Sequence, residues 1–218
     1  MNASVREHLL KSKPPKTQRR DWEAILASAE ADRAAVDSVL RLEAGDVVVD
    51  VGCGYGRLAA AFAKTGVGYV GLDVNKKRAA YAGGLYAPYT DCQFFTLPVG
   101  NDRYNPGGKR PEKATLPLGA DLFAAAFAVS LFTHIHAADG VRQYLREISR
   151  ILAPGGVLLS TWLTEPTGKA SDDHRAWYAC LDVETFLKEA GFETVSAEGA
   201  GTVESHLRVL SRNNKGAP

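Results

Sequence analysis

Cysteine is scarce in this chain, and the three cysteines, Cys53, Cys92 and Cys180, lie far apart in the sequence. An odd number of cysteines argues against a disulfide framework, and the wide spacing does not match the paired ligands that zinc sites need. We therefore expect neither a set of disulfide bonds nor a bound metal ion.

The chain also lacks an excess of either charge. Its 26 Lys and Arg residues nearly balance its 25 Asp and Glu residues, for a formal net charge of +1. This balance provides no positive field that would gather nucleic acid. The first twenty residues contain no apolar stretch that could act as a signal peptide or a membrane span. We expect a cytoplasmic protein without a nucleic-acid or membrane partner, and the sequence carries no sign of its oligomeric state.

The N-terminal segment differs in character from the rest of the chain. Residues 1–20 are polar and basic, which is typical of a solvated arm or lid, although such a segment could also contact phosphate or an acidic partner. Residues 21–218 contain no internal repeat and no low-complexity linker. We expect them to form a single domain, because this length suffices for one large core.

Helical and strand patterns alternate along residues 21–218. Helices are expected over 21–40, 58–64, 76–85, 141–152 and 182–190, and strands over 47–49, 69–73, 93–97, 122–129, 157–163, 194–197 and 206–210. The first strand is a β-branched run without alternation, as in strands covered on both faces. This order predicts an α/β fold: a doubly wound, Rossmann-like open sheet of about seven strands, mostly parallel, with an antiparallel strand near the C-terminus. The connection over 100–119 is irregular, and connections of that length are often functional.

A glycine-rich turn follows the first strand. The sequence from Asp50 to Gly56 reads Asp-Val-Gly-Cys-Gly-Tyr-Gly and leads directly into a helix, whose free N–H groups can meet a ligand. Asp73 lies twenty-one residues after Gly52, at the end of the second strand, where a carboxylate can accept hydrogen bonds from both hydroxyls of a ribose. Together these residues predict a nucleoside site. A nicotinamide-dependent oxidoreductase would also use a glycine-rich turn and an acidic residue after the second strand. In this chain, however, Arg57 stands where the third glycine of the dinucleotide-binding motif would fall.

The same residues carry a family resemblance. The stretch 47–57 resembles motif I of the class I methyltransferases, and 71–73 resembles the next acidic motif of that family. Three later segments are similar to the family in the expected order: 121–123, 130–135 and 145–156. The segment 101–111 resembles a subgroup of which many members act on sugars or other secondary metabolites.

The resemblance implies S-adenosylmethionine as the cofactor and methyl transfer to a small-molecule acceptor, with a hydroxyl expected first. N-methylation of a small amine, a nicotinamide-dependent oxidoreductase and a non-enzymatic scaffold are the alternatives. Methylation of nucleic acid is disfavoured, because Ser130 to Thr133 stand where an Asn/Asp-Pro-Pro-aromatic motif would be needed.

The resemblance also implies the cofactor contacts. The methionine end would lie on the glycine-rich turn, and the ribose on Asp73 with its neighbour Val74. The adenine would lie near Pro98 and Val99, where the family has an acidic residue that this chain lacks, which leaves the Val99 backbone as the substitute. Ala128 and Ser130 would line the methyl end. The expected cofactor-binding residues are Asp50, Gly52, Cys53, Gly54, Tyr55, Gly56, Asp73, Val74, Pro98, Val99, Ala128 and Ser130.

A hydroxyl acceptor calls for a general base, and an imidazole suits that role. Two histidines follow the fourth central strand, His134 and His136, and we favour His134 because it lies within the part that resembles the family. A loop histidine can equally be a surface or capping residue. Further candidates for the acceptor pocket are Asp172, Asp173, His174 and the aromatic residues Tyr104, Trp162, Trp177 and Tyr178.

Overall fold

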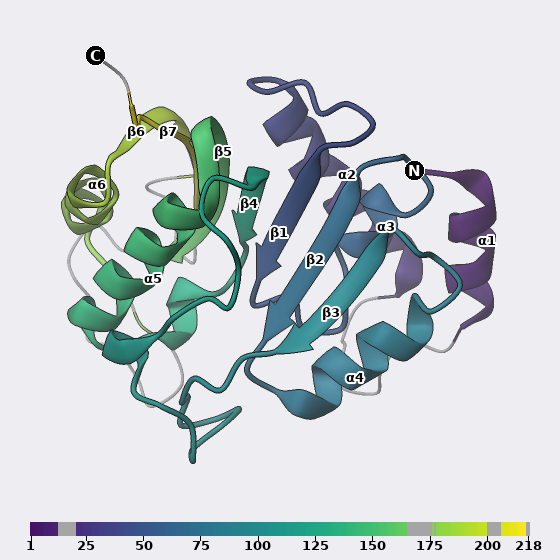
Figure 1. Cartoon of the computed structure of the whole chain (residues 1–218), viewed down its shortest axis with the longest axis horizontal. Helices are drawn as coiled ribbons and strands as arrows, with labels where there is room; N and C mark the ends of the chain where they lie inside the picture. Colours follow the sequence, from purple (N-terminus) through teal and green to yellow (C-terminus); the bar gives the residue numbers. More distant parts are fainter. Residues whose placement is uncertain (13–20, 165–175, 177, 200–205, 217–218) are drawn as a thin grey trace.

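One twisted sheet forms the centre of the computed structural model, which describes residues 1–12, 21–164, 176, 178–199 and 206–216 (Figure 1). In the described part of the chain the sheet has seven strands in the order β3-β2-β1-β4-β5-β7-β6. Their bounds are β1 (Val47–Val51), β2 (Gly68–Asp73), β3 (Cys92–Thr96), β4 (Phe123–Ala128), β5 (Leu152–Leu163), β6 (Phe192–Glu198) and β7 (His206–Asn213). Strand β7 runs antiparallel to β5 and β6, and the other pairs are parallel. The predicted doubly wound sheet is confirmed.

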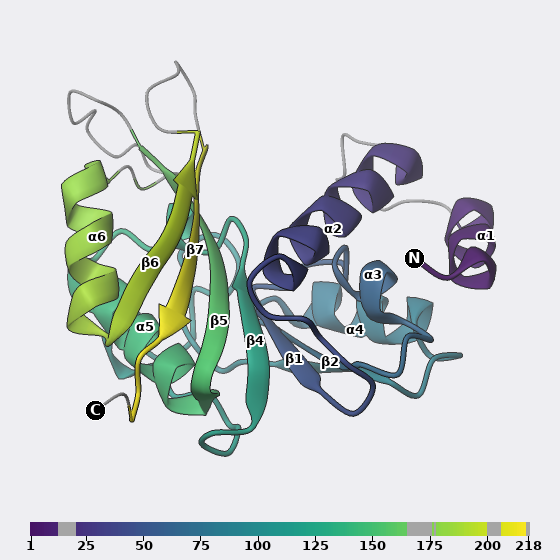
Figure 2. The ribbon, with the colours of Figure 1, turned by 90° about the horizontal axis from the view of Figure 1, so that it is seen from above.

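Helices cover both faces of the sheet (Figure 2). One face carries α1 (Ala3–Lys11), α2 (Trp22–Asp37), α3 (Ala59–Phe62) and α4 (Lys76–Leu85), and the other carries α5 (Ala138–Ile151) and α6 (Cys180–Glu189). Two apolar clusters fill the space between the helices and the sheet, one on each face. Because strand β1 contributes Val48 to one cluster and Val49 to the other, it is buried on both faces, as its β-branched run predicted. No helix in the described ranges is long and apolar enough to cross a membrane.

The interpretation of the N-terminal segment as a solvated arm is wrong for residues 3–11. They form helix α1, which Asn2 caps by accepting a hydrogen bond from the Ser4 backbone N–H. Val5 and Leu9, one helical turn apart, are completely buried in the cluster on the α2 side of the sheet. Residues 13–20 lie outside the described residues.

Two other boundaries differ from the expected ones. Helix α3 has a single turn over 59–62, shorter than the expected 58–64. Strand β5 follows α5 without a loop, so that it begins at Leu152 and takes in the turn residues expected to separate the two elements. Gly155 has a φ of +75°, and the pairing between β4 and β5 shifts its register at this level. The glycine therefore lets the chain bend inside the strand.

The connection between β3 and β4 crosses the sheet face without forming an α-helix. It contains one 3-10 turn, η1 (Pro111–Lys113), and it buries Ala114 and Leu116 against that face. Within this connection, the backbone at Gly108 passes very close to the backbone at Gly100. A Cβ on Gly108 would lie 2.4 Å from the backbone nitrogen of Gly100. This close crossing requires glycine, and it leaves the segment 100–111 at the carboxyl edge of the sheet.

The packing of α1 predicts a difference between two adjacent leucines. Leu9 is fully buried, whereas the side chain of Leu10 is 42% exposed. Leu9→Ala should therefore lower the free energy of unfolding by about 2–5 kcal/mol, and Leu10→Ala by no more than about 0.5 kcal/mol. Urea denaturation of both variants and the wild type measures the difference. If α1 were a detached arm, the two variants would be equally stable.

Candidate functional site

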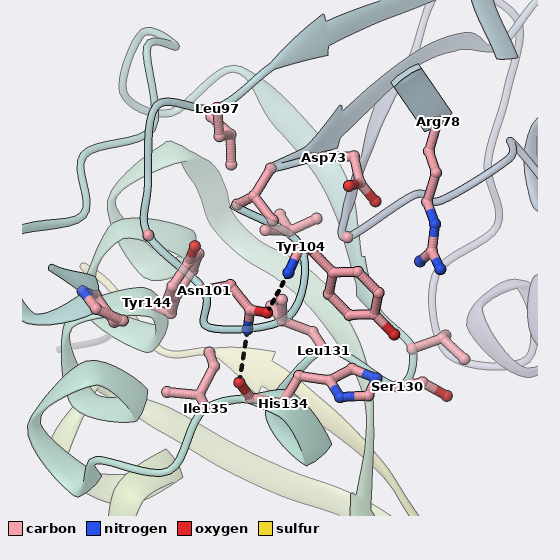
Figure 3. A pocket seen from close by; sticks show the side chains of 16 residues that line it. Asp73, Arg78, Leu97, Asn101, Tyr104, Ser130, Leu131, His134, Ile135 and Tyr144 are labelled. Atoms are coloured by element: carbon pink, nitrogen blue, oxygen red, sulfur yellow. Dashed lines mark hydrogen bonds between the residues drawn. The ribbon is translucent and has the colours of Figure 1, made fainter. Parts of the chain in front are cut away.

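A pocket opens at the carboxyl ends of β1, β2 and β4, the edge where open α/β sheets bind ligands (Figure 3). Its walls come from these strand ends, from α4 and α5, from the segment 97–111 and from the turn η2 (Phe132–His134). Elements far apart in the sequence therefore share one cavity.

The glycine-rich turn forms the floor of the pocket at the end of β1. Gly52 has a φ of +89°, and its N–H donates a hydrogen bond of 2.7 Å to the carbonyl of Leu72 in β2. A Cβ at this position would lie 3.3 Å from the Leu131 side chain across the pocket. Glycine is thus required for the bend, and it keeps the space above the backbone open to a ligand.

Arg57 fastens the end of this turn to α2. Its guanidinium donates to the carboxylate of Asp32 at 2.6 Å and to the hydroxyl of Ser28 at 3.1 Å. Asp32 also pairs with Arg208 of β7 at 2.9 Å. The turn is therefore tied to α2, and through Asp32 to strand β7.

Asp73 stands at the end of β2 with both carboxylate oxygens oriented by backbone amides. Oδ2 accepts from Gly54 at 2.8 Å and Oδ1 accepts from Asn75 at 2.7 Å. Each oxygen has a further acceptor site, and Asp73 lines the pocket although only 6% of it is exposed. Burial raises the pKa of this carboxyl, whereas the two amide hydrogen bonds lower it.

A strained turn after β4 brings a histidine into the pocket. Ser130 has a φ of +58°, which is unusual for a residue with a side chain, and its N–H donates to Thr161 Oγ1 at 2.7 Å. The Ser130 carbonyl accepts from the Thr133 hydroxyl at 2.9 Å. These bonds hold the turn that leads into η2, where His134 faces the cavity.

The segment 100–111 covers the pocket. Asn101 donates its side-chain amide to the carbonyl of His134 at 2.9 Å and accepts from the backbone N–H of Tyr104 at 3.0 Å. The Tyr104 ring meets the His134 ring edge-on at 5.2 Å, and the Arg78 guanidinium lies 4.3 Å from the centre of the same Tyr104 ring. A side chain from α4, one from the connection and one from η2 therefore meet over the cavity (Figure 3).

The structure brings together five of the residues expected in the site. These are Gly52, Asp73, Val74, Ser130 and His134. The remaining expected residues do not line this pocket: Asp50, Cys53, Gly54, Tyr55, Gly56, Pro98, Val99, Ala128 and His136. His136 is exposed, and Ala128 is completely buried in the core on the α5 side.

Packing explains several of these placements. A Cβ on Gly56 would lie 2.9 Å from the ring of Tyr86, so this glycine allows α4 to approach the turn. Cys53 is buried against Gly71 of β2. Tyr55 packs against Tyr81 and under the Arg78 guanidinium, which lies 5.2 Å from the centre of its ring.

Asp50 is buried away from the pocket. Its carboxylate accepts a hydrogen bond of 2.6 Å from the hydroxyl of Tyr69 on β2. The pKa of Asp50 is raised to about 7, and burial is the largest cause. The hydrogen bond from Tyr69 and the charge of Arg57 lower this pKa, and the charges of Asp73 and Asp32 raise it.

Pro98 and Val99 are engaged by the segment 100–111. The Pro98 carbonyl accepts from the Lys109 N–H at 2.9 Å, and the Val99 carbonyl accepts from the Asn105 side chain at 2.8 Å. Pro98 lines a separate groove beside the pocket, and the Val99 side chain is buried. The expectation that the Val99 backbone replaces the missing acid stays a prediction.

The candidate acceptor residues lie in different places. Tyr104 lines the pocket, whereas Trp162 is buried in the core and stacks on Phe132 at 4.1 Å. Tyr178 donates its hydroxyl hydrogen to the carbonyl of Ile135. Asp172, Asp173, His174 and Trp177 lie outside the described residues. Among the residues that the structure describes, no three His, Cys, Asp or Glu side chains form a group that could hold a metal ion.

Several pocket residues were not anticipated from the sequence: Arg78, Asn101, Leu131, Ile135 and Tyr144. The sequence does contain a signal for Arg78. Asn75, two residues after Asp73, is a typical helix N-cap, and it places Arg78 in the first turn of α4 beside the end of β2. The others depend on how the connection crosses the sheet.

A family model described as a methyltransferase domain matches residues 27–197. An O-methyltransferase of Aspergillus sclerotiorum, resE, is 28% identical over 137 residues, which cover 62% of this chain and 47% of that protein. The chain thus matches about half the length of this relative.

Solved structures share the fold. A SAM-dependent methyltransferase from Aquifex aeolicus is 16% identical with a TM-score of 0.57, over 89% of this chain and all of that chain. The [4+2]-cyclase SpnF is 19% identical with a TM-score of 0.67, over 84% of this chain and 80% of that chain. At these identities the likeness concerns the fold alone, and the fold supports more than one reaction.

The buried carboxyl of Asp50 predicts a pH dependence of stability. The folded protein retains this proton up to about pH 7, whereas an unfolded aspartate releases it near pH ~4. The folded state therefore binds more protons between these values, so the stability of the wild type relative to Asp50→Asn should fall as pH rises from ~4 to ~7. The stability of the wild type relative to Asp50→Asn should fall by at most ~4 kcal/mol over this range. Above pH ~7 the difference in unfolding free energy between the two proteins should stay constant. Urea titrations across this range measure it, and a difference independent of pH would contradict the burial of a titrating group.

Proposed function

We propose a reaction for this chain from one premise: it belongs to the methyltransferase-domain family, and its cofactor is S-adenosylmethionine. The reaction proposed is transfer of the methyl group to a hydroxyl of a small-molecule acceptor, with His134 as the general base. The observation that carries it is that Asp73 and His134 line the same pocket.

The residues of the pocket fit this cofactor. The open backbone at Gly52 would receive the amino-acid end, because a side chain there would fill the space in front of Leu131. Asp73 would accept hydrogen bonds from the ribose hydroxyls with the acceptor sites that its amide partners leave free. Two unlike parts of the cofactor thus have matching partners within one cavity.

S-adenosylmethionine, when bound, supplies an electrophilic methyl group on a positively charged sulfur. His134 would take the proton of the acceptor hydroxyl on a ring nitrogen while the hydroxyl oxygen forms its bond to the methyl carbon and the sulfur–carbon bond breaks. Tyr104 and Arg78 cover the pocket and would exclude water from the reacting groups.

Electrostatics supports the role of His134. The charge of His134 lowers the pKa of Asp73, which means that a protonated imidazole and the carboxylate attract one another across the pocket. The Asn101 hydrogen bond to the His134 carbonyl holds the backbone of η2 beside the segment 100–111.

A hydroxyl is favoured as the acceptor for two reasons. A hydroxyl needs a base, whereas an unprotonated amine can react through its own lone pair, and a histidine is present at the pocket wall. The relative from Aspergillus sclerotiorum is an O-methyltransferase.

Cofactor binding is the first test of this proposal. S-adenosylhomocysteine should raise the unfolding temperature of the protein and NAD should not, because only a ligand that binds the folded state stabilises it. Asp73→Asn should weaken S-adenosylhomocysteine binding by about 10- to 100-fold, the range for hydrogen bonds to a charged group. Calorimetric titration measures both. Tight binding of NAD with no binding of S-adenosylhomocysteine would refute the proposal.

The role of His134 is tested by a matched pair of histidines. His134→Ala should reduce methyl transfer by about 10²-fold or more, with nearly unchanged affinity for S-adenosylhomocysteine. His136→Ala should retain the wild-type rate, because His136 is exposed and does not line the pocket. Transfer of a labelled methyl group to a panel of phenols and sugars provides the rates. Equal rates for the two variants would exclude His134 as the base.

A further inference from the structure

Tyr144 of α5 is a buried residue with a hydroxyl that faces the pocket. The residue is 2% exposed, it lines the cavity, and Figure 3 shows its oxygen directed inward. Within the described part of the chain this hydroxyl has no hydrogen-bond partner. The hydroxyls of Tyr69 and Tyr178 do have partners, Asp50 and the carbonyl of Ile135. The buried hydroxyl of Tyr86 also lacks a partner among the described residues, but Tyr86 does not line this pocket. A hydroxyl that opens onto a cavity and makes no hydrogen bond to a described residue is available to a ligand.

Polar and apolar side chains line the pocket together with Tyr144. The apolar ones include Leu97, Leu131 and Ile135, which cannot accept a hydrogen bond from its hydroxyl. Asp73 raises the pKa of the Tyr144 hydroxyl through its negative charge, in addition to the larger effect of burial. The hydroxyl therefore lies within electrostatic reach of the carboxylate and keeps its proton as a donor.

A nucleoside whose ribose is bound by Asp73 must place its base beside that carboxylate. After the end of β3, the carbonyls of Pro98 and Val99 each already accept one hydrogen bond, from Lys109 and Asn105. Pro98 also has no N–H to donate. Tyr144 is thus a hydrogen-bond donor in the same pocket as Leu97, which follows the end of β3.

We propose that the Tyr144 hydroxyl donates a hydrogen bond to a ring nitrogen of the adenine of the bound cofactor. This inference rests on the proposed function, since it assumes that an adenosine occupies the pocket. Recognition of the base is thereby assigned to α5, a helix far from the glycine-rich turn in the sequence.

Removal of the hydroxyl tests the proposal. Tyr144→Phe should weaken binding of S-adenosylhomocysteine by roughly three- to tenfold, as expected for one hydrogen bond. Without ligand, the variant should unfold at the same temperature as the wild type or slightly higher, because the hydroxyl has no protein partner to lose. The matched control is Tyr86→Phe, which removes a buried hydroxyl on the opposite face of the sheet and should bind like the wild type. Equal affinities for wild type and Tyr144→Phe would overturn the proposal.

Deaza analogues of S-adenosylhomocysteine identify the acceptor atom. In the 1-deaza, 3-deaza and 7-deaza analogues, one ring nitrogen is replaced by C–H. With one of the three, the wild type and Tyr144→Phe should bind equally, because the acceptor is gone. A full penalty for Tyr144→Phe with all three would refute donation to a ring nitrogen. If the wild type binds no S-adenosylhomocysteine at all, the proposed function fails, which separates that failure from a failure of the Tyr144 assignment.

Discussion

The carboxylate of Asp73 is the contact on which the site depends. It accepts one hydrogen bond from Gly54 in the turn after β1 and another from Asn75 at the start of α4. Because β1 and β2 pair in parallel register, with Val51 opposite Leu72, the two loops leave the sheet side by side and the carboxylate can join them. The same oxygens face the pocket. One side chain therefore fixes the local backbone and presents the charge that a ribose would meet.

The second constraint is the connection between β3 and β4. It crosses the sheet face as irregular chain, held by Ala114 and Leu116 in the core and by the close approach of Gly100 and Gly108. This path sets Tyr104 against Arg78 and His134, which come from opposite sides of the pocket. The cover of the cavity thus depends on the packing of a segment that has little regular structure of its own.

Local chemistry explains how much could be predicted from the sequence. The turn at Gly52 and the position of Asp73 follow from strand ends and glycine placement, which are encoded within a few residues. Tyr144 and Leu131 could not be foreseen, because their approach depends on how distant elements cross. Helix α1 was not predicted, for a different reason. Val5 and Leu9 lie one helical turn apart, but two apolar residues among basic and polar ones are too short a pattern to predict a packed helix.

A structure of the complex with S-adenosylhomocysteine is the most direct test of this account. The account predicts that the ribose hydroxyls lie on the Asp73 carboxylate, that the amino-acid end lies over Gly52, and that the sulfur faces the side of the pocket occupied by His134. A complex in which the ligand binds elsewhere and Asp73 touches no ribose hydroxyl would contradict it.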